Sequence, residues 1–201
     1  MKAKSGVSLR KLAEADFPTR HGHFRIHGFQ LGQEEAVTLV MGDPAGSQAP
    51  LVRIHSQCLT GDVFGSLRCD CRDQLELSLQ KISAEHCGLV IYDQKEGRGI
   101  GLMNKLQAYQ LQDRGVDTVE ANKTLGFDAD LRNYHLPGAI LRHFGITAVR
   151  LLSNNPNKVR ALEEAGIQVR QRVPCEVLAG ETRRRYMKTK RDKMGHLLSG
   201  F

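Results

Sequence analysis

Three cysteines lie close together in the sequence, at Cys58, Cys69 and Cys71. Thiolate is a soft ligand that suits zinc, and close cysteines in a chain without a signal peptide are more often metal-binding or catalytic than disulfide-bonded. A catalytic zinc site uses three protein ligands and leaves a position for water or substrate, whereas a structural site uses four. The three thiols therefore favour an open catalytic site. If His55 were a fourth ligand, the site would be structural instead.

Two predicted strand-to-helix junctions have the composition of anion sites. In the first, Glu96–Gly101, the glycines let backbone amides approach an anion, and Arg98 can hold a phosphate. This motif lacks the Walker lysine and is not a full dinucleotide fingerprint, so a plain tight turn is the alternative. The second junction, Ser153–Lys158, combines a hydroxyl, free amides and a lysine, with an ordinary helix N-cap as the alternative. Together, the two junctions favour a polyphosphate ligand.

A carboxylate and a guanidinium stand two residues apart at Asp130 and Arg132, in a polar loop. The carboxylate could orient the arginine, although a solvated ion pair is the default for such a pair. The spacing alone does not predict catalysis.

Composition limits the partners of the chain. With 201 residues, 40% hydrophobic and 25% charged, we expect a single globular domain. A net charge of +7 favours anionic partners. The 5% aromatic content and the absence of Trp argue against nucleic-acid binding. Without an apolar run of about 18 residues or a signal-type core, we expect a soluble, cytoplasmic protein with no membrane partner.

The elements that must position these residues alternate between strand and helix. Strands are predicted at 23–27, 35–41, 51–55, 89–92, 148–152 and 167–173. Helices are predicted at 75–82, 100–111, 137–144 and 156–165, each followed by a glycine. Residues 1–20 are expected to form an N-terminal arm, and residues 176–201 a basic C-terminal tail with a solvated helix over 181–195. The pattern predicts a layered α/β/α fold with a mixed, largely parallel sheet and a strand-rich N-terminal part.

Six segments together carry a resemblance to a known family. They are Arg53–Asp62, Ser66–Cys71, Glu96–Leu102, Asp117–Asn122, Leu125–Phe127 and Leu151–Pro156. In this order the chain resembles GTP cyclohydrolase II, the enzyme that opens riboflavin biosynthesis, from about Phe17 to Leu198. We expect the stand-alone form, because the chain has no room for the dihydroxybutanone phosphate synthase domain that is fused in some relatives.

The resemblance implies hydrolysis of GTP to formate, pyrophosphate and 2,5-diamino-6-(5-phospho-D-ribosylamino)pyrimidin-4(3H)-one. It also implies one Zn²⁺ per chain, Mg²⁺ with the GTP phosphates, and a homodimer. The zinc ligands would be Cys58, Cys69 and Cys71, and zinc would activate the water that attacks the purine C8.

The family's other functional positions can be carried over one by one. Contacts with GTP would come from Arg53, Ile54, His55, Ser56, Gln57, Gln74, Glu96, Gly97, Arg98, Thr118, Ser153 and Lys158, with Glu120 accepting the guanine protons. Asp130 would be the proton acceptor, Arg132 the nucleophile at the α-phosphate, and Tyr109 a residue needed for ring opening. Because a guanidinium is almost always protonated, stabilisation of the transferring phosphoryl group is the alternative role for Arg132.

The chain departs from the family pattern at Gln57, Arg72, Ser153 and Asn157, where Glu, Gly, Thr and Lys are usual. Gln57 removes a negative charge beside the metal. A second hypothesis is therefore a paralogue that stops at the formamide or takes another purine nucleotide. A third, from a different class, is a zinc-stabilised nucleic-acid-binding module, which the positive charge motivates.

Overall fold

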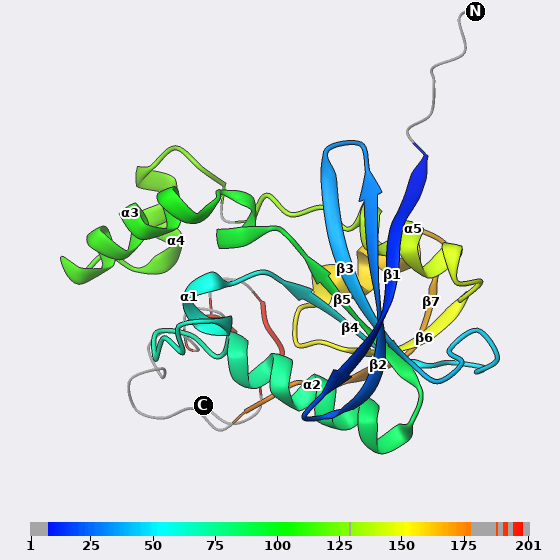
Figure 1. The fold of residues 1–201 in the computed structure, drawn as a ribbon. Coiled ribbons are helices and arrows are strands. Elements are labelled where there is room, and N and C mark those ends of the chain that lie inside the picture. Colours follow the sequence, from blue (N-terminus) through cyan, green and yellow to red (C-terminus); the bar gives the residue numbers. More distant parts are fainter. Residues whose placement is uncertain (1–7, 129, 178–187, 189–190, 193–194, 199–201) are drawn as a thin grey trace, which may run out of the picture.

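A seven-stranded sheet forms the centre of the computed structural model, with the order β1-β2-β3-β5-β4-β6-β7 (Figure 1). The structure describes residues 8–128, 130–177, 188, 191–192 and 195–198. The strands are β1 (Leu9–Thr19), β2 (Gly22–Leu31), β3 (Glu34–Met41), β4 (Leu51–Ser56), β5 (Gly88–Asp93), β6 (Ala148–Leu152) and β7 (Gln168–Val173). All six predicted strands are thus present, and β1 is an addition.

The two halves of the sheet differ in direction. Strands β1, β2, β3 and β5 pair antiparallel, whereas β5, β4, β6 and β7 pair parallel. The first two connections span only two residues, and such short turns can join only antiparallel neighbours. The sheet is therefore mixed as predicted, but its parallel part is confined to β5, β4, β6 and β7.

Strand β1 replaces most of the arm that was predicted over residues 1–20. Its residues pair with β2 from Leu9↔Leu31 to Thr19↔Gly22. Nearly all of its side chains are exposed on both faces, so the strand has no apolar alternation from which to predict it. Backbone hydrogen bonds hold this edge strand in place. Residues 1–7 lie outside the described part of the chain.

Helices cover both faces of the sheet and complete the predicted α/β/α layers (Figure 1). On one face α2 (Cys71–Glu85) buries Ile82 against Leu51 and Val90. On the other face α5 (His135–His143) and α6 (Pro156–Glu164) join the larger cluster around Ile54. The cores on both faces fix β4 between β5 and β6, so the carboxyl end of β4 lies at the middle of the parallel half.

Three helices lie at or beside the carboxyl ends of the strands. They are α1 (Leu59–Asp62), α3 (Leu102–Asp113) and α4 (Thr118–Thr124). Helices α3 and α4 pack together, away from β6 and β7 (Figure 1). Helix α4 was not predicted, although Asp117 caps it by accepting hydrogen bonds from the N–H groups of Val119 and Glu120. Helix α5 begins at His135, two residues before the predicted start at Pro137.

The organisation of the chain as one domain with a basic tail stays a prediction. Most of the helix predicted over 181–195 lies outside the described residues. Among the described helices, none combines the length and the apolar character that a membrane span requires.

Candidate active site

A cleft opens at the carboxyl ends of β4, β5 and β6 and brings together most of the residues that the sequence singled out. It is lined by Arg53, His55, Ser56, Gln57, Cys58, Cys69, Cys71, Gln74, Glu96, Gly97, Arg98, Tyr109, Arg132, Ser153 and Lys158. This edge is where parallel α/β sheets place their ligands, because the loops that follow neighbouring strands meet there. The separate sequence motifs thus form one site.

The three cysteines of the sequence motif come together at one end of the cleft. The Sγ atoms of Cys58, Cys69 and Cys71 all lie within 4.8 Å of one another. Cys58 precedes α1 and Cys71 begins α2, so the two helices fix two of the thiols. A Cβ atom on Gly61 would lie 2.8 Å from the Cys69 Sγ, so only glycine fits beside the thiols. Three converging thiols around a side-chain-free position suit a soft metal such as zinc.

The fourth-ligand role considered for His55 finds no support in the described residues. His55 Nε2 lies 3.1 Å from both carboxylate oxygens of Asp62, and the imidazole is 1% exposed. Burial also lowers the pKa of His55, which favours the neutral ring. The described residues therefore provide a three-cysteine group, which is the open form of the site.

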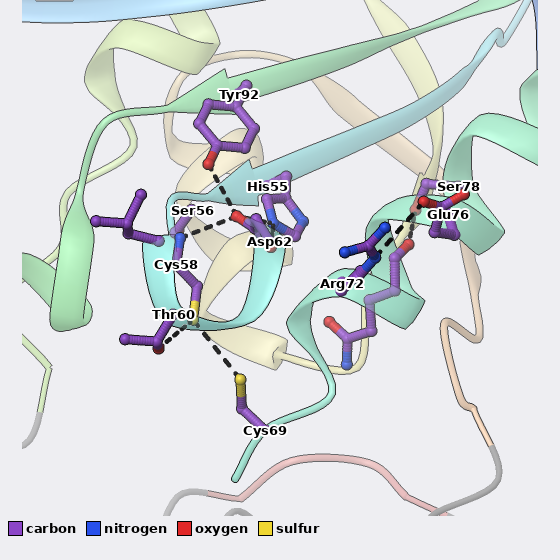
Figure 2. Close-up of polar contacts among 12 residues, drawn as sticks. His55, Ser56, Cys58, Thr60, Asp62, Cys69, Arg72, Glu76, Ser78 and Tyr92 are labelled. Carbon is purple, nitrogen blue, oxygen red and sulfur yellow. Dashed lines mark hydrogen bonds and ion pairs between the residues drawn. The ribbon is translucent and has the colours of Figure 1, made fainter. Parts of the chain in front are cut away.

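Asp62 joins the cysteine loop to the sheet, a role that sequence reasoning missed. Its Oδ2 accepts hydrogen bonds from the Cys58 N–H at 3.0 Å and from the Tyr92 hydroxyl at 2.8 Å. Figure 2 shows this carboxylate between His55, Tyr92 and the Cys58 backbone. The local signal was an acidic residue four positions after Cys58, where a carboxylate can accept the first free N–H of a helix.

A second carboxylate, that of Glu96, holds the other side of the same loop. Its Oε2 accepts a hydrogen bond from the Leu59 N–H at 2.6 Å, and its Oε1 accepts one from the Lys105 ammonium at 2.7 Å. The Gly97 N–H donates to the same Oε1 at 2.9 Å. The Glu96 carboxylate is therefore bound by groups of the protein itself, and it connects the glycine loop to the cysteine cluster.

The glycine loop itself is a left-handed turn. Gly97 and Arg98 have φ values of 61° and 64°, and Arg98 is a non-glycine residue in a region that side chains disfavour. A Cβ atom on Gly99 would lie 3.2 Å from the Leu131 Cβ, which explains the need for glycine at this close approach. The Leu131 N–H donates to the Arg98 carbonyl at 3.1 Å, so the loop is tied to the Asp130–Arg132 segment.

Three of the cations that line the cleft, Arg53, Lys158 and Arg132, form what we call its cationic end. The Arg53 guanidinium donates to the Leu152 carbonyl at 3.0 Å and to Gln74 Oε1 at 2.7 Å, and the Lys158 ammonium donates to the Ile54 carbonyl at 2.7 Å. Burial, followed by repulsion from Arg53 and Arg132, lowers the pKa of Lys158 well below its usual range. A bound anion would offset this crowding of positive charge.

Arg132 is the third cation, and Asp130 fixes its orientation. The two carboxylate oxygens of Asp130 accept from Arg132 Nε at 2.8 Å and from its Nη2 at 2.5 Å, and Nη1 donates to Ser56 Oγ at 3.2 Å. Burial opposes ionisation of Asp130, but the hydrogen bonds from Arg132 lower its pKa below the ordinary value. The pair is therefore ionised and held in a fork, and is not the solvated pair that its spacing alone suggests.

The Ser153–Lys158 junction contains the predicted N-cap and also lines the cleft. Asn155 caps α6 by accepting a hydrogen bond from the Asn157 N–H at 2.9 Å, which is the ordinary N-cap. The same turn places Ser153 and Lys158 in the cleft wall. A helix cap and a charged surface therefore coexist in one segment.

Three predicted positions within the described part of the structure lie outside the lining of the cleft. Ile54 is a core residue that contributes only its carbonyl to Lys158, and Asp130 acts through Arg132. Glu120 is exposed and pairs with Lys123 at 3.1 Å. The side chain of Thr118, the first residue of α4, is not among those that the structure describes. Several further residues line the cleft without a role predicted from the sequence, namely Arg68, Lys95, Ile100, Lys105, Ala108, Gln112, Asn122, Asn154, Asn155 and His196.

The fold and the site define an α/β protein with a candidate metal centre at one end of a cationic cleft. The sequence profile of the family GTP cyclohydrolase II matches residues 10–174. Because this match covers most of the chain, the protein belongs to the GTP cyclohydrolase II family.

Curated relatives fall into two groups by length. The chain is 49% identical to a GTP cyclohydrolase-2 of Hahella chejuensis and 47% identical to one of Shewanella amazonensis, covering 96% of this chain and 94% and 95% of those proteins. It is 51% identical to the riboflavin biosynthesis protein RibBA of Bacillus subtilis, over 94% of this chain and 48% of that protein. The chain thus spans about half the length of the RibBA proteins that it matches.

Proposed function

We propose that this protein hydrolyses GTP to formate, pyrophosphate and 2,5-diamino-6-(5-phospho-D-ribosylamino)pyrimidin-4(3H)-one, the first step of riboflavin biosynthesis. One observation carries the proposal: a group of three thiols and a wall of three cations face the same cleft. A nucleoside triphosphate needs both, a site for chemistry on its base and positive charge for its phosphates. Family membership names GTP as the nucleotide.

The cationic wall is the proposed triphosphate site. Arg53, Arg132 and Lys158 donate to carbonyl, amide, hydroxyl and Asp130 oxygens, so only one of these hydrogen-bond partners is a carboxylate. The polyphosphate supplies the missing negative charge, and Mg²⁺ enters with it as part of the substrate. Ser153 and the glycine loop border this wall and add a hydroxyl and backbone amides.

The thiol group is the proposed zinc site, with Cys58, Cys69 and Cys71 as ligands and one metal per chain. Zinc bound there would lower the pKa of a coordinated water and so supply the nucleophile for the purine ring. The Tyr109 hydroxyl lies 3.2 Å from Thr60 Oγ1, and the ring lines the cleft near the thiols. This position fits a role for Tyr109 in orienting the base or the opened ring.

The Asp130–Arg132 fork is the proposed catalytic pair at the α-phosphate. Arg132 has three donor nitrogens already fixed by Asp130 and Ser56, which suits a group that stabilises developing charge more than one that must lose a proton. Asp130 is ionised, which is the form that a proton acceptor requires. Glu120 and Thr118 are part of the same proposal as contacts of the guanine. The homodimer implied by the resemblance is part of the same proposal.

Turnover of GTP tests this proposal. Zinc-loaded protein with GTP and Mg²⁺ should release formate and pyrophosphate in equal amounts, together with the ultraviolet spectrum of the pyrimidine product. Pyrophosphate without formate would replace the proposal with the altered paralogue and direct attention to Gln57. Neither product, with salt-sensitive RNA binding instead, would favour the nucleic-acid-binding module.

A further inference from the structure

Lys105 reaches the cysteine cluster from helix α3 and has no role assigned by the sequence motifs. Its ammonium lies 3.1 Å from the Cys58 Sγ and 2.7 Å from Glu96 Oε1, and its side chain is only 12% exposed. Lys105 stands four residues before Tyr109, so one face of α3 directs both side chains into the cleft. The ammonium therefore lies between a metal ligand and the carboxylate that anchors the glycine loop.

The surroundings of this ammonium favour a charged, fixed group. The ammonium pairs with the Glu96 carboxylate at 2.7 Å, and the Cys58 sulfur is its second partner at 3.1 Å. Glu96 is itself fixed by the N–H groups of Leu59 and Gly97. The contacts with Glu96 and Cys58 thus hold the flexible side chain of Lys105 in one position.

The contact between the Lys105 ammonium and the Cys58 sulfur would compensate negative charge at the metal site. Three thiolates around a divalent ion leave one net negative charge in a partly buried site, and such charge is costly unless it is compensated. An N–H donor on a thiolate sulfur reduces the charge that the sulfur carries. It also fixes the direction of its lone pairs, as partners of metal ligands commonly do.

We propose that Lys105 is a positioning residue of the metal site, which donates to the Cys58 sulfur and joins the cysteine cluster to the glycine loop through Glu96. The inference rests on the proposed zinc-dependent function for its context. Its test uses metal binding without GTP, so its failure and the failure of the proposed activity are distinguishable.

The first measurement is the affinity for Zn²⁺, by competition with a chromophoric chelator. In Lys105→Met, the dissociation constant for zinc should rise about 10- to 100-fold, the usual cost of removing a partner of a metal ligand. Gln107→Met, a change on the exposed face of the same helix, should leave it unchanged. If Lys105→Met does not fold, Lys105→Gln removes the charge with a polar side chain and should show the same direction of change.

The second measurement separates a direct effect on the sulfur from general loosening of the site. In the Co²⁺-substituted protein, the thiolate-to-cobalt absorption band should move to longer wavelength in Lys105→Met, because the sulfur loses its hydrogen bond. Lys105→Arg, which keeps a cationic donor, should restore part of the wild-type position. A zinc affinity and a cobalt band in Lys105→Met equal to those of the wild type would overturn the proposal.

A double-mutant cycle tests the connection through Glu96. Glu96→Gln and Lys105→Met should each weaken zinc binding, and the double variant should cost less than the product of the two effects because both act through one contact. Independent, multiplicative effects would contradict the claim that Glu96 and Lys105 act together.

Discussion

Around the thiols of the cleft, which we call its thiol end, two carboxylates bind the backbone beside Cys58, with Asp62 on the Cys58 N–H and Glu96 on the Leu59 N–H. At the cationic end, Arg53 and Lys158 are held mainly by backbone carbonyls. Carbonyls orient a cation but leave its full charge uncompensated, whereas a carboxylate neutralises it. In the proposed function, the thiol end therefore holds a cation, and the cationic end receives an anion.

This difference in hydrogen-bond partners suggests separate roles for the two ends in the proposed reaction. The thiol end is built in advance, because its ligands must converge within bonding distance of one ion. At the cationic end, burial and then repulsion from Arg53 and Arg132 lower the pKa of Lys158, and the proposed polyphosphate would offset both. Variants at the two ends should therefore fail in different ways.

Removal of a thiol should have the largest effect. In Cys69→Ser, the release of both formate and pyrophosphate should fall by at least about 10³-fold, because the charge stabilisation supplied by a metal is worth several kcal/mol. Cys87→Ser, at a half-buried cysteine remote from the cluster, is the matched control and should keep its activity. Full activity in Cys69→Ser would refute the role of the thiol end.

Removal of a cation should impair substrate binding more than metal binding. In Lys158→Met, the KM for GTP should rise about 10- to 100-fold, as expected for loss of one hydrogen bond to a charged group, while zinc content stays constant. Arg160→Met removes a cation from the exposed face of the same helix and should have little effect. Equal effects in the two variants would mean that only net charge matters.

A methyl group beside the thiols tests how tightly the thiol end is built. In Gly61→Ala the new Cβ would lie 2.8 Å from the Cys69 Sγ, so the thiol must move and zinc affinity should fall about tenfold. Gly28→Ala places its Cβ in open space and serves as the control. Unchanged zinc affinity in Gly61→Ala would show that the Cys69 thiol can move without loss of metal binding, and would contradict a fixed arrangement of the three thiols.

The last prediction concerns stability and not activity, and it involves Asp93, a buried carboxylate near Lys158 and Arg132. Burial raises the pKa of Asp93 from 3.8 to about 6, so the folded state favours the protonated carboxyl group. The contribution of this group to stability is therefore complete below about pH 4 and is lost as the pH rises through 6. Asp93→Asn should therefore raise the melting temperature at pH 8, by the equivalent of up to about 3 kcal/mol, and much less at pH 4. The exposed Asp16→Asn is the control, and thermal melts at both pH values are the measurement. A pH-independent difference would contradict this assignment.

Sequence reasoning found the residues with strong chemical signatures and missed those that support them. The cysteine spacing, the glycine loop and the Ser153–Lys158 junction were all located, because each is a local motif. Asp62 and Lys105 were missed because their partners depend on how α1 and α3 pack against the strands. Strand β1 was missed because an edge strand exposed on both faces lacks the apolar alternation that predicts strands.

The central claim is that the thiol end holds one zinc ion on which the chemistry of the cationic end depends. The most direct test is to titrate metal-free protein with Zn²⁺ and to measure formate release from GTP with Mg²⁺ at each step. Activity should rise in proportion to zinc and reach a plateau at one equivalent per chain. Full formate release from the metal-free protein, or a zinc requirement that persists unchanged in Cys69→Ser, would contradict the account.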